Sequence, residues 1–176
     1  MNYANIKTHD IANGPGVRVS LYVSGCTHHC KGCFNPETWD HSYGDVFDDA
    51  AADRIIKALE PKHIRGFSLL GGEPFDPQNS PEMAKFLKRV LKTYPEKDIW
   101  CYTGYDFEKD LMTYKVGEME AVCDMLSCID VLVDGRFVEN LKVIDLRFRG
   151  STNQRIIDVK KSLAADEVVE WHDRHQ

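Results

Sequence analysis

Three cysteines crowd into one short stretch of the sequence. Cys26, Cys30 and Cys33 fall within "SGCTHHCKGCFN", separated by three and then by two residues. Thiolate sulfur is a soft ligand suited to zinc ions and to iron–sulfur clusters. A closed structural zinc site takes four protein ligands, whereas a cubane cluster held by three cysteines leaves one iron open to a ligand that is not protein. An open [4Fe–4S] cluster is therefore favoured, with a zinc site and a disulfide or chance grouping as the alternatives.

The rest of the chain supplies no obvious fourth ligand. His28 and His29 lie inside the tight loop itself, and we expect them to be solvated or to lie behind the ligands. Cys101 lies in an expected strand, and Cys123 lies on the apolar stripe of an expected helix. Both positions are typical of small buried hydrophobic residues rather than of metal ligands.

The composition narrows the classes of partner. A chain of 176 residues fits a single domain, 1–176, and 43% hydrophobic residues are enough for a core. The formal net charge of -6 argues against a nucleic-acid surface. The first ten residues lack the apolar core of a signal peptide, and no apolar run approaches the roughly 18 residues that span a bilayer. We expect a cytoplasmic protein with no membrane partner, in a reducing compartment where clustered cysteines bind metals.

Strand and helix patterns alternate along the chain, which is typical of a parallel α/β sheet. Strands are expected near 17–23, 66–74, 98–105 and 129–137, helices over 45–61, 80–95 and 116–127, and further short strands near 143–147 and 156–159. Asp45 and Ser80 are the expected caps of the first two helices.

Four polar motifs each follow an expected strand. They are "SGC" at Ser24–Cys26, "GGEP" at Gly71–Pro74, "TGY" at Thr103–Tyr105 and "DGRF" at Asp134–Phe137. Parallel α/β sheets and barrels carry their active sites at the carboxyl ends of the strands. We therefore expect the cysteine loop to face the other three motifs across one mouth.

These motifs carry a resemblance to a known family. The cysteine spacing, followed by Phe34 and later by "GGEP", resembles the radical S-adenosylmethionine (SAM) superfamily. The sequence "NGPGVR" from Asn13 resembles the activating enzymes of glycyl-radical proteins. "CKGCFNPETW", "YTGY", "VLVDGRF" and "RGSTNQR" resemble the branch that activates anaerobic, class III ribonucleotide reductases. The resemblance runs from about Asn2 to Val159, and it implies an open partial (βα) barrel with mostly parallel strands.

The resemblance also implies roles for named residues. Cys26, Cys30 and Cys33 would hold one [4Fe–4S] cluster, whose open iron is chelated by the amino and carboxylate groups of SAM. The stretch Gly32, Cys33 and Phe34 would contact the adenine. Gly71 and Gly72 allow close backbone approach, and Glu73 can accept hydrogen bonds from the methionine ammonium group.

Further residues are weaker candidates. Thr103 could line the ribose or methionine, Asp134 could bind ribose hydroxyls, and Arg136 could pair with the SAM carboxylate. The alternatives are a turn-forming Thr-Gly pair and a surface ion pair. By resemblance, the turn at 13–16, with Arg18, would lie near the channel for the partner peptide, and residues 153–155 would cover the cluster or touch the partner.

The implied reaction is that of a radical SAM oxidoreductase. A low-potential donor such as flavodoxin or ferredoxin reduces the cluster, and SAM is consumed as a cosubstrate, giving methionine and a 5′-deoxyadenosyl radical. That radical takes a hydrogen atom from a glycine Cα of the anaerobic reductase's large subunit. The alternatives are an activase for another glycyl-radical enzyme of the formate-lyase type, a radical SAM enzyme acting on a small molecule, and a zinc-stabilised module without catalysis.

Overall fold

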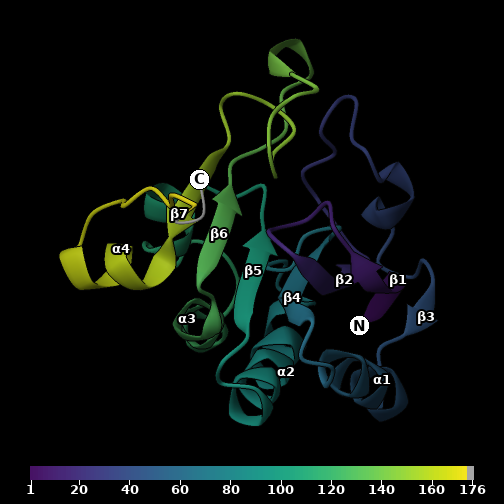
Figure 1. Ribbon diagram of the computed structural model, residues 1–176. Helices are drawn as coiled ribbons and strands as arrows, with labels where there is room; N and C mark the ends of the chain where they lie inside the picture. The colour runs from purple at the N-terminus through teal and green to yellow at the C-terminus, as the bar shows by residue number, and fades with distance from the viewer. Residues whose placement is uncertain (174–176) are drawn as a thin grey trace.

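A seven-stranded sheet organises the chain in the computed structural model, which describes residues 1–173 (Figure 1). Its strands are β1 (Asn2–Asp10), β2 (Val17–Val23), β3 (Asp45–Val46), β4 (Ile64–Gly71), β5 (Asp98–Tyr102), β6 (Val131–Asp134) and β7 (Arg155–Asp158). The helices are α1 (Asp49–Leu59), α2 (Ser80–Thr93), α3 (Met119–Cys128) and α4 (Val159–Ala165), with short helical turns at Pro36–Trp39, Phe107–Leu111 and Glu139–Leu141. No helix within residues 1–173 has the length and apolar character needed to cross a membrane.

The middle of the sheet is parallel and its edges are antiparallel. The strand order is β3-β1-β2-β4-β5-β6-β7, and the four strands β2, β4, β5 and β6 run parallel to one another. β1 runs antiparallel to β2, and β7 runs antiparallel to β6. The mostly parallel α/β fold is thus confirmed in the middle of the sheet, while the radical SAM partial barrel stays a prediction.

The two faces of the sheet differ in what covers them. Side chains alternate along each strand, so that Ile99 and Cys101 of β5 join the large core with helices α1 to α3. Trp100 of the same strand belongs to a small second cluster on the other face, where Trp171 from the tail packs against it with ring centroids 4.9 Å apart. Helices α1, α2 and α3 lie below the strands in Figure 1, whereas α4 lies apart at the left. The opposite face is left free of α1–α3 around the carboxyl ends of β2, β4 and β5.

Several element boundaries differ from the sequence-based expectations. Asp48, not Asp45, caps α1 by accepting a hydrogen bond from the backbone N–H of Ala51 at 2.9 Å. Asp45 is instead part of β3, which pairs with β1. Asn79, rather than Ser80, precedes α2. The expected strand at 143–147 is not formed, and no strand was expected at β1.

Arg18 anchors the turn before β2 to the sheet. Its side chain is fully buried and its Nε donates to Ser68 Oγ at 2.7 Å, while its guanidinium pairs with Asp98 at 2.6 Å. It also donates to the Pro15 carbonyl oxygen. The expectation that Arg18 helps to bind a partner is wrong for its side chain, because no part of that side chain reaches the surface.

We expect Arg18→Met to lower the free energy of unfolding by about 3–5 kcal/mol, because it removes one partner of a buried ion pair and leaves carbonyl groups unpaired. Arg89→Met is the matched control, since Arg89 pairs with Asp53 on the surface and should contribute less than about 1 kcal/mol. Anaerobic urea unfolding of both variants in the same metal state measures the difference. Equal losses for the two would contradict an anchoring role for Arg18.

Candidate functional site

A cavity of about 480 Å³ opens at the carboxyl ends of β2, β4 and β5. Sites for small molecules and cofactors are commonly about 300–1,000 Å³. The predicted site residues that line it are Cys26, Cys30, Cys33, Phe34, Gly71, Gly72, Glu73 and Thr103. Tyr22, Leu70 and Tyr102 also line it, which places the cavity on the face opposite the large core. The expected convergence of the cysteine loop with "GGEP" and "TGY" is therefore confirmed, and Gly135 and Phe137 bring "DGRF" to the same cavity.

Backbone amides point at each of the three cysteine sulfurs in the cavity. The donors are His28 and His29 for Cys26, Phe137 for Cys30, and Asn35 for Cys33 at 3.4 Å. Burial raises the pKa of Cys26 to about 11 and also raises the pKa of Cys30. Amide hydrogen bonds to sulfur counter that cost for a thiolate, and they are among the features that set the potentials of iron–sulfur clusters. The environment thus suits thiolates that are bound to a metal.

The arrangement of the cysteines bears on the disulfide and zinc alternatives. All six cysteines are free thiols, so the disulfide alternative is wrong. Sulfurs that share one zinc ion at about 2.3 Å must lie within roughly 4 Å of one another. Within residues 1–173, one set of three potential metal ligands has all its donor atoms within 4.8 Å of one another. That set is Asp106, Glu108 and Asp134, and it contains no cysteine. In this arrangement the three sulfurs therefore do not lie as close together as the ligands of one zinc ion.

The "GGEP" turn docks directly on the cysteine loop. Gly72 donates its backbone N–H to Val23 O at 2.7 Å, and Glu73 donates to Gly25 O at 2.8 Å. A Cβ on Gly72 would lie 2.5 Å from that Gly25 oxygen, and Gly71 has a φ of +111°. Both glycines therefore have a packing reason to be present, independent of any ligand.

The carboxylate of Glu73 is the centre of the site. Its Oε1 accepts from the Phe75 N–H at 2.9 Å and from Thr103 Oγ1 at 2.8 Å. Its Oε2 accepts from the Gly104 N–H at 2.8 Å and contacts His28 Nε2 at 3.0 Å. The residue has no exposed surface. Thr103, predicted to line SAM, thus bonds Glu73 directly.

Sequence reasoning missed two residues that support this site. Of the two expectations for His28, solvated or behind the ligands, the second fits, because its side chain is only 4% exposed and lies against Glu73. Asn79 is buried, and its Nδ2 donates to Ser24 O at 2.9 Å and to Glu73 O at 3.0 Å. The position of Asn79 just before a Ser-Pro helix start was a signal for a cap, but not for a link to the cysteine loop.

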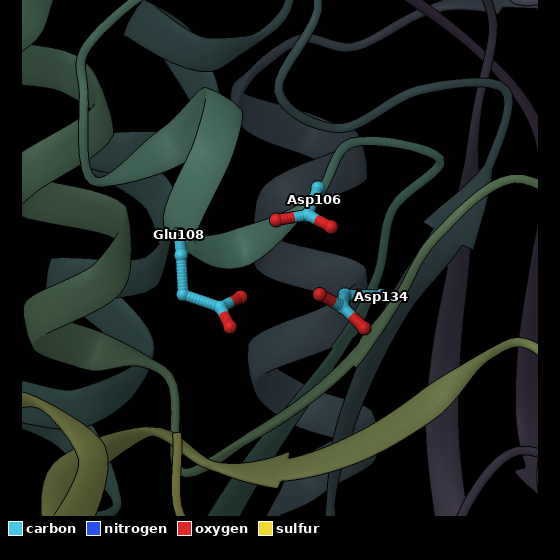
Figure 2. A group of neighbouring side chains, drawn as sticks. All are labelled: Asp106, Glu108 and Asp134. Carbon is cyan, nitrogen blue, oxygen red and sulfur yellow. The ribbon is translucent and has the colours of Figure 1, made fainter. Parts of the chain in front are cut away.

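Asp134 lies outside the lining of the cavity and is engaged elsewhere. Its carboxylate accepts from the Phe107 N–H at 2.9 Å and pairs with Arg155. Asp106, Glu108 and Asp134 point toward one another in Figure 2. Arg155 pairs with all three carboxylates, and its hydrogen bonds to Asp134 and then Glu108 raise its own pKa. The guanidinium of Arg155 therefore already lies among the three carboxylates.

The remaining predicted residues lie at or beyond the mouth. Phe34 is 60% exposed and packs against Phe137 with ring centroids 5.0 Å apart. Gly32 has a φ of +72° and lies beside Glu139 rather than in the lining. Arg136 is exposed, and only its backbone oxygen has a described hydrogen bond, from Asn153.

Comparison with known proteins agrees with this site. Residues 12–157 match the family described as "4Fe-4S single cluster domain". The chain is 44% identical over 157 residues to the "Anaerobic ribonucleoside-triphosphate reductase-activating protein" of Escherichia coli (strain K12), covering 88% of this chain and 96% of that protein. It is 40% identical over 156 residues to the protein of the same description from Enterobacteria phage T4, covering 89% and 93%.

A third such protein, from Salmonella typhimurium, is 42% identical over 157 residues, covering 88% of this chain and 96% of its own length. The similarity extends over nearly the whole of both chains in each comparison, and the family match at residues 12–157 spans the cysteine loop. The chain therefore belongs to the family of anaerobic ribonucleoside-triphosphate reductase-activating proteins, with a 4Fe-4S single cluster domain.

Proposed function

We propose that this chain is a radical SAM activase that generates the glycyl radical of an anaerobic ribonucleoside-triphosphate reductase. The observation that carries the proposal is that Cys26, Cys30 and Cys33 share one cavity with the Gly71–Glu73 turn. The reductase is proposed as the target because the relatives are named as activating proteins of that enzyme. The formate-lyase type of target has no such support.

Cys26, Cys30 and Cys33 would hold a [4Fe–4S] cluster and leave one coordination position for SAM. When bound, the cluster and SAM supply a single electron and a 5′-deoxyadenosyl radical, which takes a hydrogen atom from a glycine Cα of the reductase. The protein binds and positions these groups, while the cofactor carries the redox chemistry.

The chain's own residues would divide the work of holding SAM. Glu73 offers a buried carboxylate for the methionine amino group, and Gly71 and Gly72 let the backbone come close. Phe34, exposed at the mouth beside Phe137, offers a ring for the adenine. For Gly32, Asp134 and Arg136 the proposed SAM contacts require a rearrangement, since none of them lines the cavity.

The open face of the sheet supports a protein substrate. None of helices α1 to α3 covers the side on which the cavity opens, so a segment of the reductase can approach the site from there. We further propose a low-potential donor such as flavodoxin or ferredoxin, a cytoplasmic location, and one functional domain over 1–176. The tail supports that last point, since the Trp171 N–H donates to Ile156 O at 2.8 Å, tying the tail to β7.

Cysteine substitutions test the cluster site. We expect Cys26→Ser, Cys30→Ser and Cys33→Ser each to hold less than about a tenth of the wild-type iron and sulfide after anaerobic reconstitution, because each removes a direct ligand. Cys123→Ser is the matched control, because Cys123 is an exposed thiol on α3. Elemental analysis and the visible absorption of the cluster measure the outcome. Full iron content in a loop variant, or stoichiometric zinc in the wild type, would contradict the proposal.

The target is tested by transfer of the radical. Incubation of the reduced, cluster-loaded protein with SAM and the anaerobic reductase should give 5′-deoxyadenosine and an organic radical signal on the reductase. Freeze-quench EPR and chromatography measure the two products, and a reductase with the target glycine replaced by alanine is the control. Radical formation on a formate-lyase-type enzyme but not on the reductase would overturn the choice of target.

A further inference from the structure

Exposed apolar side chains gather on the segment that joins β6 to β7. Within residues 1–173, eleven large apolar side chains are exposed to solvent. Four of them fall within one stretch of this segment, and we call these four the rim patch: Val138, Leu141, Val143 and Ile144, at 38%, 42%, 42% and 90% exposure. Apolar side chains that are exposed together, rather than singly, mark sites of interaction with a partner.

The fold of the segment gives no reason for its apolar residues. The apolar pattern at 143–147 predicts a strand, but no strand forms there. The segment is held at its base, where Lys142 bridges to Ser151 and the Thr152 N–H donates to Leu141 O at 2.9 Å. From there it stands beyond the carboxyl end of β6, at the top of Figure 1. A partner that covers these side chains would explain why they are apolar.

The rim patch is continuous with the cavity that holds the cysteines. Leu146 and Phe148, which follow the patch in the same segment, line that cavity. Phe34 also lines it, and the Nζ of Lys142 lies 5.0 Å from the centre of the Phe34 ring. A protein that contacts the rim patch would therefore lie beside the opening of the cavity.

The same segment is basic although the chain as a whole is acidic. Residues 136–149 contain four cations and two acids, whereas the formal net charge of the chain is -6. Lys31 of the cysteine loop, 90% exposed, adds a cation where it pairs with Glu139 at 3.2 Å. Charges at the edge of an interface are commonly matched by opposite charges on the partner. The segment thus suits a partner with an apolar surface bordered by acidic groups.

We propose that the rim patch is the docking surface for the anaerobic reductase, which contacts it beside the glycine segment that enters the cavity. This inference rests on the proposed function for its partner and adds the surface that the partner uses. A second copy of this chain suits the patch less well, because it would stand at the opening that a protein substrate needs. An electron donor also suits it less well, because electron-transfer contacts are commonly small and transient and need no exposed apolar patch.

The test measures binding of the purified anaerobic reductase from the same organism to the cluster-loaded protein, without oxygen and with SAM present, by biolayer interferometry. The variants are Ile144→Ser and the double change Val143→Ser with Ile144→Ser. The control is Met119→Ser, because Met119 is 60% exposed but lies on α3, outside the segment. Iron content and the change in the EPR spectrum on adding SAM are recorded for every variant without the reductase, since neither requires docking.

We expect Ile144→Ser to weaken binding of the reductase on the order of tenfold, because an isoleucine buried in an interface removes apolar surface from water. The double change should weaken it further, Met119→Ser should not, and the iron content and the EPR response of all three should match the wild type. Binding by the wild type should also weaken as salt is added, since opposite charges are screened.

Unchanged binding of the reductase to the double variant would overturn the inference, as would an equal loss in Met119→Ser or a loss of the EPR response to SAM. So would wild-type binding that does not weaken with salt. If the double change instead alters the oligomeric state, or slows reduction of the cluster by flavodoxin, while the reductase binds as before, the patch serves a second copy or the donor. A wild type that binds the reductase but shows no EPR response to SAM would refute the proposed function and leave the docking surface standing.

Discussion

The site depends on the need to satisfy one buried carboxylate. Glu73 has no exposed surface, and an ion of this kind is tolerated away from water only when hydrogen-bond donors surround it. Its donors come from its own turn, from the end of β5 and from the cysteine loop. One residue therefore fixes three loops relative to one another, and the position of the cysteines above the sheet follows from that.

Hydrogen bonds of the backbone also connect the Glu73 turn to the cysteine loop. The Glu73 N–H bonds to Gly25 just before the first cysteine, and Asn79 bonds to Ser24 and to the Glu73 carbonyl oxygen from the start of α2. A Cβ at Gly72 would break this contact. The glycines therefore allow the two loops to pack together, and the same lack of a side chain would let a ligand approach the backbone.

The division of the sheet into two faces explains how a chain of this size can combine a core with an open site. Helices α1 to α3 bury the alternate residues of β4 and β5, such as Leu69 and Cys101, and supply the large core. The intervening residues, such as Leu70 and Tyr102, line the cavity on the other face. Stability and access to the site thus come from opposite sides of the same strands.

The convergence of the motifs was predictable from the sequence, because the carboxyl ends of parallel strands must meet at one edge. Contacts between residues that lie far apart in the sequence were not predictable in this way. Strand β1, which lies between β3 and β2, has no strict alternation of buried and exposed residues. Asp45 pairs with β1 as part of β3, and Asp48 caps α1 instead. For His28, a solvated position and one behind the ligands were both expected, because its partner, Glu73, lies 45 residues away. Asp134 was expected to bind ribose hydroxyls, but its carboxylate pairs with Arg155 of β7.

Helix α3 shows that the periodicity of apolar residues alone does not identify which side chains are buried. The sequence places Cys123 on the apolar stripe of this helix, but Cys123 is exposed, while Val122, Met125 and Leu126 belong to the large core. A short apolar segment supports more than one stripe, and tertiary packing chooses between them.

The central claim is that three cysteines hold a cluster with one iron open beside Glu73. The most direct measurement is the EPR spectrum of the anaerobically reconstituted and reduced protein, recorded with and without SAM. The proposal predicts a [4Fe–4S]+ signal whose g-values shift when SAM is added, because the open iron gains a ligand. A cluster signal that SAM leaves unchanged, or a protein that forms no cluster, would contradict it.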